Sequence, residues 1–373
     1  MARAVRETHT VHQLPGKHAS HVIAASNLAL LVVLTIGLEL AFGNWFAAFV
    51  PPQSAIVNRS YKYRQNLYYP YGDVLYRRDK YGLRGSHETV SEIELVTVGG
   101  STTDQHYITE GQTWQDVLGA LTGVRVANAG VDGMTSFGHL VAVSEWLHEI
   151  PNFSPKSYLH YIGVNDAVLS QESRQHDFDR SGRLNPSLLS LFKRSAIVGA
   201  AEKLWFRSTG PRAVAHGAIT PRLNATFAKV DIDRDTIESF IESVYKPNLR
   251  KLIQLHRHRN EGVIFVSQIA HPSLIQWKND ETFVAADSGD LGKFAVALSM
   301  INIATEGTCR ESVDLCRFSD LATRVRFEAR DFYDLVHTTP SGAEKIAAFL
   351  AEEACSHAPA RDEIRGTLPH CLP

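Results

Sequence analysis

Cysteine is scarce in this chain of 373 residues, and its four cysteines all stand in the last 65 residues of the sequence. None of them forms a CxxC pair, so the usual signature of a zinc ribbon or of a thioredoxin-type redox motif is missing. An even number at short spacings is compatible with disulfides in an oxidising compartment, and also with reduced thiols. Proximity along the chain favours Cys309 with Cys316 and Cys355 with Cys371, while the other two connectivities stay open.

A surplus of positive charge is also missing, because 38 Lys and Arg residues face 40 Asp and Glu residues, for a net charge of -2. A protein that binds nucleic acid through its phosphates needs such a surplus to release counterions, so we expect no nucleic-acid partner. The 25 glycines and 15 prolines are too few for a collagen-like or linker-like chain, and we find no internal repeat. With 44% hydrophobic residues, the chain is expected to form one large α/β domain, or one domain with appendages.

One long apolar run is present, at residues 22–50, where the only formal charge is Glu39. A helix that spans a bilayer needs roughly 20 mostly apolar residues, and Trp45 and Phe46 suit the headgroup region. A cleaved signal peptide would have a shorter leading segment and a shorter apolar core, and a buried helix of a soluble protein is the third alternative. We therefore predict a retained membrane anchor at residues 22–50, preceded by an N-terminal tail at residues 1–21.

The charges that flank this anchor do not orient it. Three basic residues stand on each side within a similar reach, so the positive-inside rule gives a tie. The cysteine pairs favour a body outside the cytoplasm, because disulfides persist there. The basic residues are Arg3, Arg6 and Lys17 before the anchor, and Arg59, Lys62 and Arg64 after it.

Residues 51–90 are rich in Tyr, Arg and Asn and keep neither a helical nor a strand period for long. We expect this segment to form an extended lead-in that wraps the body. Segments of this composition can bind sugars or acidic groups, but packing against the domain surface is the interpretation we favour. The body then occupies residues 91–373.

The body alternates apolar runs with amphipathic ones, the pattern of a parallel sheet covered by helices. An insertion at residues 170–233 interrupts this rhythm, with a helical pattern at 187–206; insertions of this kind often shape a substrate site. The five expected strands are residues 95–98, 124–127, 158–162, 263–268 and 313–316. The expected helices between them are residues 113–121, 138–150, 234–259, 291–305 and 341–355.

A serine follows the first expected strand, in the run Gly99-Gly100-Ser101-Thr102-Thr103. Ligands of open α/β sheets bind outside the carboxyl ends of the strands. Two glycines allow a sharp turn that would raise the Ser101 hydroxyl into this crevice, although such runs are also common in plain loops. The run is not a phosphate loop, since the lysine expected after the glycines is missing.

Candidate oxyanion donors follow the second and third expected strands. Glycines at 130 and 133 lie in the segment 128–136, where a glycine can present its backbone N–H to an oxyanion or merely close a turn. The run Gly163-Val164-Asn165-Asp166 offers the side-chain amide of Asn165, with plain Asn-Asp turn chemistry as the alternative.

A candidate base stands near the C-terminus, where Asp334 and His337 are three residues apart. On one turn they can face each other, so that the carboxylate orients the imidazole and stabilises the imidazolium that forms when a serine is deprotonated. A lone Asp-x-x-His pair can equally be structural. Together with the serine, a glycine and the asparagine, it completes a nucleophile, a base, an orienting acid and oxyanion donors.

The ordered set Gly-Gly-Ser, Gly, Gly-Val-Asn-Asp and Asp-x-x-His resembles the SGNH/GDSL hydrolase superfamily over about residues 95–355. The resemblance implies a flavodoxin-like, three-layer α/β/α sandwich around a five-stranded parallel sheet. Nothing in the sequence calls for a metal or an organic cofactor. The implied site residues are Ser101 as nucleophile and N–H donor, Gly133 as second oxyanion donor with Gly130 as fallback, Asn165 as third donor, His337 as base and Asp334 as its orienting acid.

One position departs from the family pattern, because Gly100 stands where the Gly-Asp-Ser motif has an acid that normally orders the nucleophile loop. Gly-Gly-Ser-Thr-Thr variants resemble membrane-anchored bacterial members linked to extracellular or cell-envelope polysaccharide. The resemblance therefore implies a serine esterase acting on an acylated glycan, anchored in the inner membrane with a periplasmic catalytic domain, beside envelope polysaccharide machinery. An O-acyltransferase with a sugar hydroxyl as acceptor and a non-catalytic carbohydrate-binding subunit are the alternatives.

Other polar residues are assigned to structure rather than chemistry. The run from His256 to Arg259 ends an expected helix, where cations suit the helix dipole, so we expect a solvated turn rather than a metal site. Trp114 and His271 could border the crevice, and core packing or loop structure is the interpretation we favour.

Overall fold

The computed structural model describes residues 17–43, 45, 57–169, 194–209, 234–278, 282–285 and 289–356. Three expectations fall wholly or partly outside these residues: most of the N-terminal tail, most of the insertion at 170–233, and the pairing of Cys355 with Cys371.

A five-stranded parallel sheet forms the centre of the body, with the strand order β4-β3-β5-β6-β9. The central strands β3 and β5 are buried along their whole length, which explains why they read as continuous apolar runs rather than as alternating ones. The strands are β3 (Leu95–Gly99), β4 (Val126–Asn128), β5 (Ser157–Tyr161), β6 (Gly262–Val266) and β9 (Cys316–Ser319).

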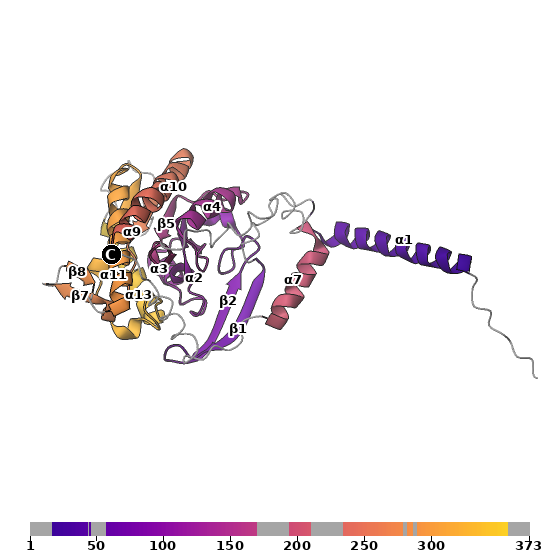
Figure 1. Ribbon diagram of the computed structural model, residues 1–373, viewed down its shortest axis with the longest axis horizontal. Helices are drawn as coiled ribbons and strands as arrows, with labels where there is room; N and C mark the ends of the chain where they lie inside the picture. Colours follow the sequence, from indigo (N-terminus) through magenta and orange to yellow (C-terminus); the bar gives the residue numbers. More distant parts are fainter. Residues whose placement is uncertain are drawn as a thin grey trace, which may run out of the picture.

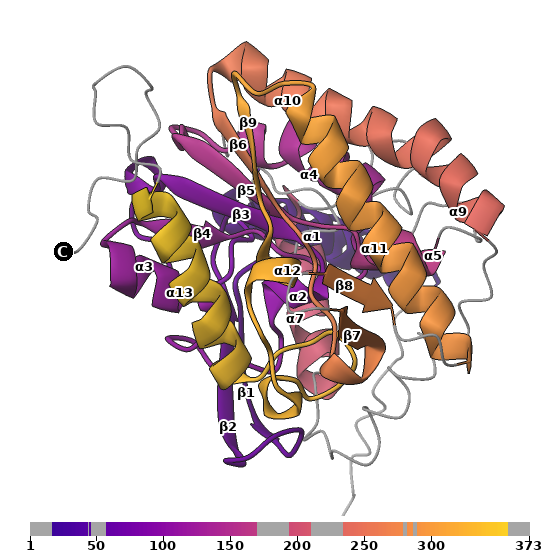
Figure 2. The same ribbon diagram turned by 90° about the vertical axis from the view of Figure 1, so that its left-hand side faces the viewer.

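Helices cover both faces of this sheet (Figure 2). On one face, α3 (Trp114–Thr122) and α13 (Pro340–Ser356) pack on a core that includes Trp114 and Leu159. On the other face, α4 (Ser136–Glu145), α10 (Lys246–Arg259) and α11 (Gly289–Arg310) pack on a larger core around Phe265 and Phe294. The predicted three-layer α/β/α sandwich is thus confirmed, and Trp114 is core, as expected.

Four of the five expected strands lie within two residues of their expected ends, and the fifth lies three residues further on. The sequence placed that strand at 313–316, whereas β9 begins at Cys316. A turn occupies the preceding residues: the N–H of Ser312 donates to the carbonyl of Cys309 at 2.9 Å, and Val313 is 79% exposed. A disulfide joins Cys309 to Cys316 across this turn, so the covalent link takes residues 313–315 out of the sheet.

The expected lead-in contains a regular element that the sequence analysis missed. Strands β1 (Arg59–Gln65) and β2 (Gly72–Arg78) pair antiparallel as a hairpin, with Tyr63 opposite Val74. Its inward positions include the polar residues Gln65 and Arg78, both buried. Polar residues on the inner face hide the alternation of apolar and polar residues by which a half-buried strand is recognised.

The N-terminal helix α1 (Lys17–Phe42) projects away from the body (Figure 1). Its segment His21–Phe42 is long and apolar enough to cross a membrane, with a mean hydropathy of 2.1, and none of it is buried. The one acid in it, Glu39, accepts hydrogen bonds from the Ser195 hydroxyl at 2.6 Å and the Ala196 N–H at 2.8 Å, at the start of α7 (Ala196–Thr209). Glu39 therefore ties the projecting helix to α7, which lies beside its end (Figure 1).

The remaining described elements are short or lie at the edges of the body. They are α2 (Ser101–Asp104), α5 (Val164–Leu169), α9 (Arg234–Phe240), the π-helical turn η4 (Ile241–Tyr245), the hairpin strands β7 (Ile275–Lys278) and β8 (Thr282–Ala285), α12 (Leu321–Arg324), and the 3-10 turns η1 (Val90–Glu92), η2 (Leu147–Glu149), η5 (Pro272–Leu274) and η6 (Ala329–Asp331).

A substitution of Phe265 on β6 tests the assigned core between the sheet and α11. Its side chain is 0% exposed, so Phe265→Ala should lower the free energy of unfolding by about 3–5 kcal/mol through lost burial and an unfilled cavity. Val296→Ala on α11, at a side chain that is 41% exposed, serves as the control and should change the stability by less than about 0.5 kcal/mol. Urea unfolding followed by circular dichroism measures both, and equal effects would contradict the assigned core.

Candidate active site

Ser101 stands at the first position of α2, directly after the central strand β3 ends at Gly99. The two glycines before it are required by close packing. A Cβ on Gly99 would lie 2.6 Å from the carbonyl oxygen of Tyr161, and a Cβ on Gly100 would lie 2.5 Å from the side-chain nitrogen of Asn165. The acid of a Gly-Asp-Ser motif therefore does not fit at position 100 without displacing Asn165.

The structure brings Ser101, His337 and Asp334 together, although 236 residues separate the serine from the histidine. The Nε2 atom of His337 lies 2.6 Å from Ser101 Oγ, and its Nδ1 atom lies 2.7 Å from Asp334 Oδ2. The other carboxylate oxygen, Oδ1, accepts the backbone N–H groups of Val336 at 2.9 Å and His337 at 2.7 Å. These bonds hold the carboxylate against one nitrogen of the imidazole and the serine hydroxyl against the other, the arrangement that makes a serine nucleophilic.

The electrostatic surroundings of His337 favour its protonated form. Burial lowers the pKa of His337, but the charge and hydrogen bond of Asp334, followed by the charge of Asp132, outweigh it and raise the pKa above 6.5. Asp132 is exposed as a residue, yet its carboxylate reaches toward the buried Asp104, within 4.8 Å. Loss of water around that carboxylate, together with the charge of Asp104, raises the pKa of Asp132 to about 7.

The candidate oxyanion donors differ in what their N–H groups already bind. Asn165 donates one amide hydrogen to the carbonyl of Met134 at 2.9 Å, which leaves the second amide hydrogen for another acceptor. The N–H of Gly130 donates to Asn128 Oδ1 at 2.9 Å, so this fallback donor is already occupied. Gly133, at φ 78°, has no such partner among the described residues.

Asp166, next to Asn165, supports the oxyanion segment in a way that the sequence analysis missed. Its carboxylate is buried and accepts the Ser136 N–H at 3.0 Å and the Ser136 hydroxyl at 2.6 Å, at the start of α4. Asn248 of α10 also donates to the Ser136 hydroxyl, at 3.1 Å. Asp166 thus connects the segments that follow β4 and β5. In the sequence, the only sign of this role was its position next to Asn165.

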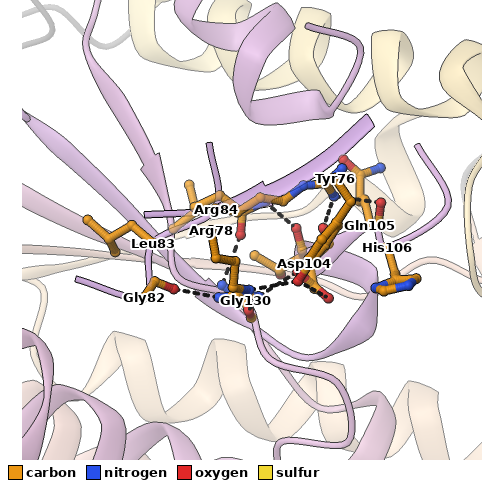
Figure 3. A network of polar contacts seen from close by, with 12 residues as sticks. Tyr76, Arg78, Gly82, Leu83, Arg84, Asp104, Gln105, His106 and Gly130 are labelled. Carbon is orange, nitrogen blue, oxygen red and sulfur yellow. Dashed lines mark hydrogen bonds and ion pairs between the residues drawn. The ribbon is translucent and has the colours of Figure 1, made fainter. Parts of the chain in front are cut away.

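A second missed feature is a buried polar network between the β1–β2 hairpin and α2 (Figure 3). Arg78 forms an ion pair with Asp104 at 2.5 Å, and both side chains are at most 4% exposed. The Tyr76 hydroxyl donates to the same carboxylate at 3.0 Å, and Arg84 donates to the carbonyls of Asp104 and Gln105. Burial would raise the pKa of Asp104, but Arg78 and Arg84 hold it below its usual range.

Among the residues that the structure describes, two groups of side chains offer three potential metal ligands each, with donor atoms within 4.8 Å of one another. In the first, the carboxylate of Glu261 already binds His148, His256 and the guanidinium of Arg259. In the second, which joins Asp104, His106 and Asp132, the ion pair with Arg78 balances the charge of Asp104. In each group one carboxylate, Glu261 or Asp104, already pairs with a guanidinium, and this positive charge opposes the binding of a further cation.

The expectation for the run His256 to Arg259 is wrong at its first residue. His256 is 0% exposed, and its Nε2 atom lies 3.0 Å from Nε2 of His160 on β5, while the three residues that follow are exposed. The sequence concealed this because one side of the last turn of α10 faces the sheet, whereas the other side faces water.

The fold of this chain resembles solved structures, whereas its sequence has no match among family models or curated proteins. No family model matches the chain, and no curated protein does. Similar solved structures include a member of the lipolytic G-D-S-L family from Veillonella parvula, at 13% identity and a TM-score of 0.41, covering 70% of this chain and 97% of that one.

Two further structures have the same degree of likeness. A GDSL-like lipase from Bacteroides thetaiotaomicron is 13% identical, with a TM-score of 0.39 over 74% of this chain and 93% of that chain. A catalytic mutant of an acetylxylan esterase from Geobacillus stearothermophilus is 14% identical, with a TM-score of 0.40 over 72% of this chain and 96% of that chain. These likenesses are remote, with identities of 14% or less.

The charge of Asp132 gives a prediction for His337. Because that negative charge helps to raise the pKa of His337, Asp132→Asn should lower the pKa of the imidazole. Titration of ¹⁵N-histidine-labelled protein by NMR measures it, with the His337 signals identified by their loss in His337→Gln. Asp314→Asn, which removes an exposed partner of Arg257, is the matched control and should leave the pKa of His337 in place. An unchanged or higher value in Asp132→Asn would contradict the assignment.

Proposed function

We propose that this protein is a serine esterase of the SGNH/GDSL type. The observation that carries the proposal is the pair of short contacts on His337, at 2.6 Å to the Ser101 hydroxyl and 2.7 Å to the Asp334 carboxylate. A serine hydrogen-bonded to a histidine, which is in turn hydrogen-bonded to a buried acid, carries out acyl transfer on several unrelated folds. Its place at the carboxyl ends of the parallel strands is where such sheets bind their ligands.

In the proposed reaction, Ser101 Oγ attacks the carbonyl carbon of an ester while its proton passes to Nε2 of His337. Asp334 stabilises the imidazolium through Nδ1. When the tetrahedral intermediate collapses, the bond to the alcohol oxygen breaks and His337 returns the proton to that oxygen. Water then attacks the acyl group on Ser101 while one of its protons passes to His337; the bond from the acyl group to Ser101 Oγ breaks, and His337 returns the proton to Oγ.

The negative oxygen of the intermediate needs donors that are in place beforehand. We assign this role to the Ser101 N–H, the Gly133 N–H and the second amide hydrogen of Asn165. Two observations support the assignment: the contact of Asn165 with Met134 sets the amide against Gly100, and the Gly133 N–H is not used elsewhere in the described part of the chain.

We further propose that the ester lies on a carbohydrate. The Tyr333 ring stacks on His337 at 5.6 Å between ring centroids, and Tyr68 stacks on Tyr333 at 6.1 Å. The hairpin turn that carries Tyr68 therefore lies beside the site, and it also presents Tyr69 and Tyr71, which are 86% and 57% exposed. Aromatic rings with a polar edge suit the mixed apolar and hydroxylated faces of a sugar.

The place of action is part of the same proposal. The apolar helix α1 would anchor the chain in the bacterial inner membrane, with the body in the periplasm beside acylated envelope polysaccharide. The disulfide between Cys309 and Cys316 supports a compartment that is oxidising. In that setting a sugar hydroxyl can replace water as acceptor of the acyl group, which would make the protein an O-acyltransferase with the same three residues.

A fluorophosphonate probe tests the nucleophile. The full chain in detergent micelles should form a covalent adduct on Ser101, located by peptide mass spectrometry, because the probe reacts with serines that a neighbouring base activates. The adduct should disappear in Ser101→Ala and in His337→Ala. His258→Ala, at an exposed histidine of α10, is the matched control and should label like the wild type. If the folded wild type formed no adduct with the probe, this result would contradict the esterase proposal.

Asn165 tests the oxyanion donors. Loss of one such donor lowers the rate roughly 100- to 1000-fold, so Asn165→Ala should hydrolyse p-nitrophenyl acetate at that reduced kcat and still exceed Ser101→Ala. Steady-state kinetics at several substrate concentrations separate kcat from KM. A kcat near that of the wild type would remove Asn165 from the oxyanion hole.

A further inference from the structure

The nucleophile and the oxyanion donors come from different β/α units, so some contact has to set the distance between them. Ser101 stands on α2, a helix of four residues, which is too short to be stable by its own hydrogen bonds. The oxyanion segment runs from Asn128 to Gly133 after β4. A displacement of about 1 Å between reacting groups can cost roughly 100-fold in rate, so the contact between these two pieces matters for catalysis.

The two pieces touch at Gly130. A Cβ on this residue would lie 2.3 Å from the backbone nitrogen of Asp104, so only a glycine lets the segment lie against the end of α2. A close approach of two backbones by itself leaves them free to slide. Polar contacts that join both pieces are needed to set their register.

Arg78 supplies such contacts. Its Nη2 atom donates both to the Asp104 carboxylate, at 2.5 Å, and to the carbonyl oxygen of Gly130 (Figure 3). Its Nε atom donates to the Tyr76 hydroxyl at 2.7 Å, and its Nη1 atom to the carbonyl of Gly82 at 2.7 Å. One buried guanidinium thus binds the helix of the nucleophile, the oxyanion segment and the hairpin together, and the planar fork of Arg fixes the angles between these bonds.

We propose that Arg78 is a positioning residue for the esterase reaction: by joining Asp104 on α2 to Gly130 of the oxyanion segment, it sets the distance from Ser101 to the oxyanion donor on that segment, Gly133. The proposal rests on the proposed function. Asp104, three residues after Ser101, takes the ordering role of the acid that Gly100 excludes, and the hairpin between the membrane anchor and the body belongs to the catalytic unit.

Arg84 completes the unit from the same segment. Its guanidinium donates to the carbonyls of Asp104, Gln105 and Ile108, at and just beyond the C-terminal end of α2, where a positive charge also suits the helix dipole. The Gln105 amide in turn donates to the Thr338 hydroxyl at 3.2 Å, beside His337. The contacts therefore extend from the hairpin through α2 to the loop of the base.

The test compares neighbouring arginines of β2 in the full chain. Arg78→Met keeps the length of the side chain and removes its donors, so kcat for p-nitrophenyl acetate should fall about 100-fold while KM stays within about twofold. Arg78→Lys keeps the charge without the fork and should recover part of the loss, to within about tenfold of the wild type. Arg77→Met, at the exposed partner of Glu110, is the matched control and should match the wild type.

A second measurement separates positioning from folding. Phenylboronic acid forms a tetrahedral adduct on an activated serine and resembles the transition state, so its inhibition constant should rise in Arg78→Met by about the factor by which kcat/KM falls. All assays are run at least 15 °C below each variant's melting temperature. Arg78→Lys takes the place of Arg78→Met should the latter fail to fold.

The outcomes are distinct. A wild-type kcat and boronate affinity in a folded Arg78 variant would overturn the positioning role and leave the esterase intact. A lower melting temperature with an unchanged kcat would do the same, because it would reduce Arg78 to a structural residue. Absence of turnover in the wild type and in Arg77→Met would overturn the proposed function and this inference with it.

Discussion

The ion pair of Arg78 with Asp104, buried beneath the helix of Ser101, is the contact on which the geometry of the site depends. Two charges removed from water destabilise a fold unless their remaining hydrogen-bonding groups are satisfied. Here the Tyr76 hydroxyl and two backbone carbonyls complete the set. Removal of one partner would leave the other buried without its counter-charge, so the hairpin and the nucleophile helix are held as one unit rather than as a body with a loose cover.

The packing around Gly100 places the Asn165 side chain beside the position that carries the acid in the Gly-Asp-Ser pattern. An acid at position 100 would meet the Asn165 amide at the point where this side chain donates to Met134. The carboxylate that orders the loop stands instead at Asp104, one helical turn later, and its counter-charge comes from β2. The glycine before Ser101 therefore occurs together with a hairpin that supplies the counter-charge of Asp104.

The three carboxylates discussed with His337 differ in the groups that surround them. Asp334 accepts two backbone N–H groups and the imidazole, and it is the partner of the histidine. Asp104 is balanced by guanidinium groups. For Asp132, loss of water around the carboxylate, together with the charge of Asp104, raises the pKa to about 7, so its charge changes near neutral pH. A change of pH across this range therefore alters the field at His337 without altering the contacts of Asp334.

The sequence by itself determined the class of fold and the three motifs that follow the first three strands, because buried parallel strands leave unbroken apolar runs and the residues after them stand at one edge of the sheet. It marked Ser101, Asn165, Asp334 and His337 as candidates, and the structure places these residues side by side. It favoured the Cys309–Cys316 pairing but misplaced the fifth strand, because the turn at residues 312–315 resembles a strand in its apolar residues. It also missed the hairpin, the burial of His256 and the pairing of Arg78 with Asp104. A charged or polar residue in a sequence reads as solvated, and only the tertiary structure, which sets its partner 26 residues away, decides that it is buried.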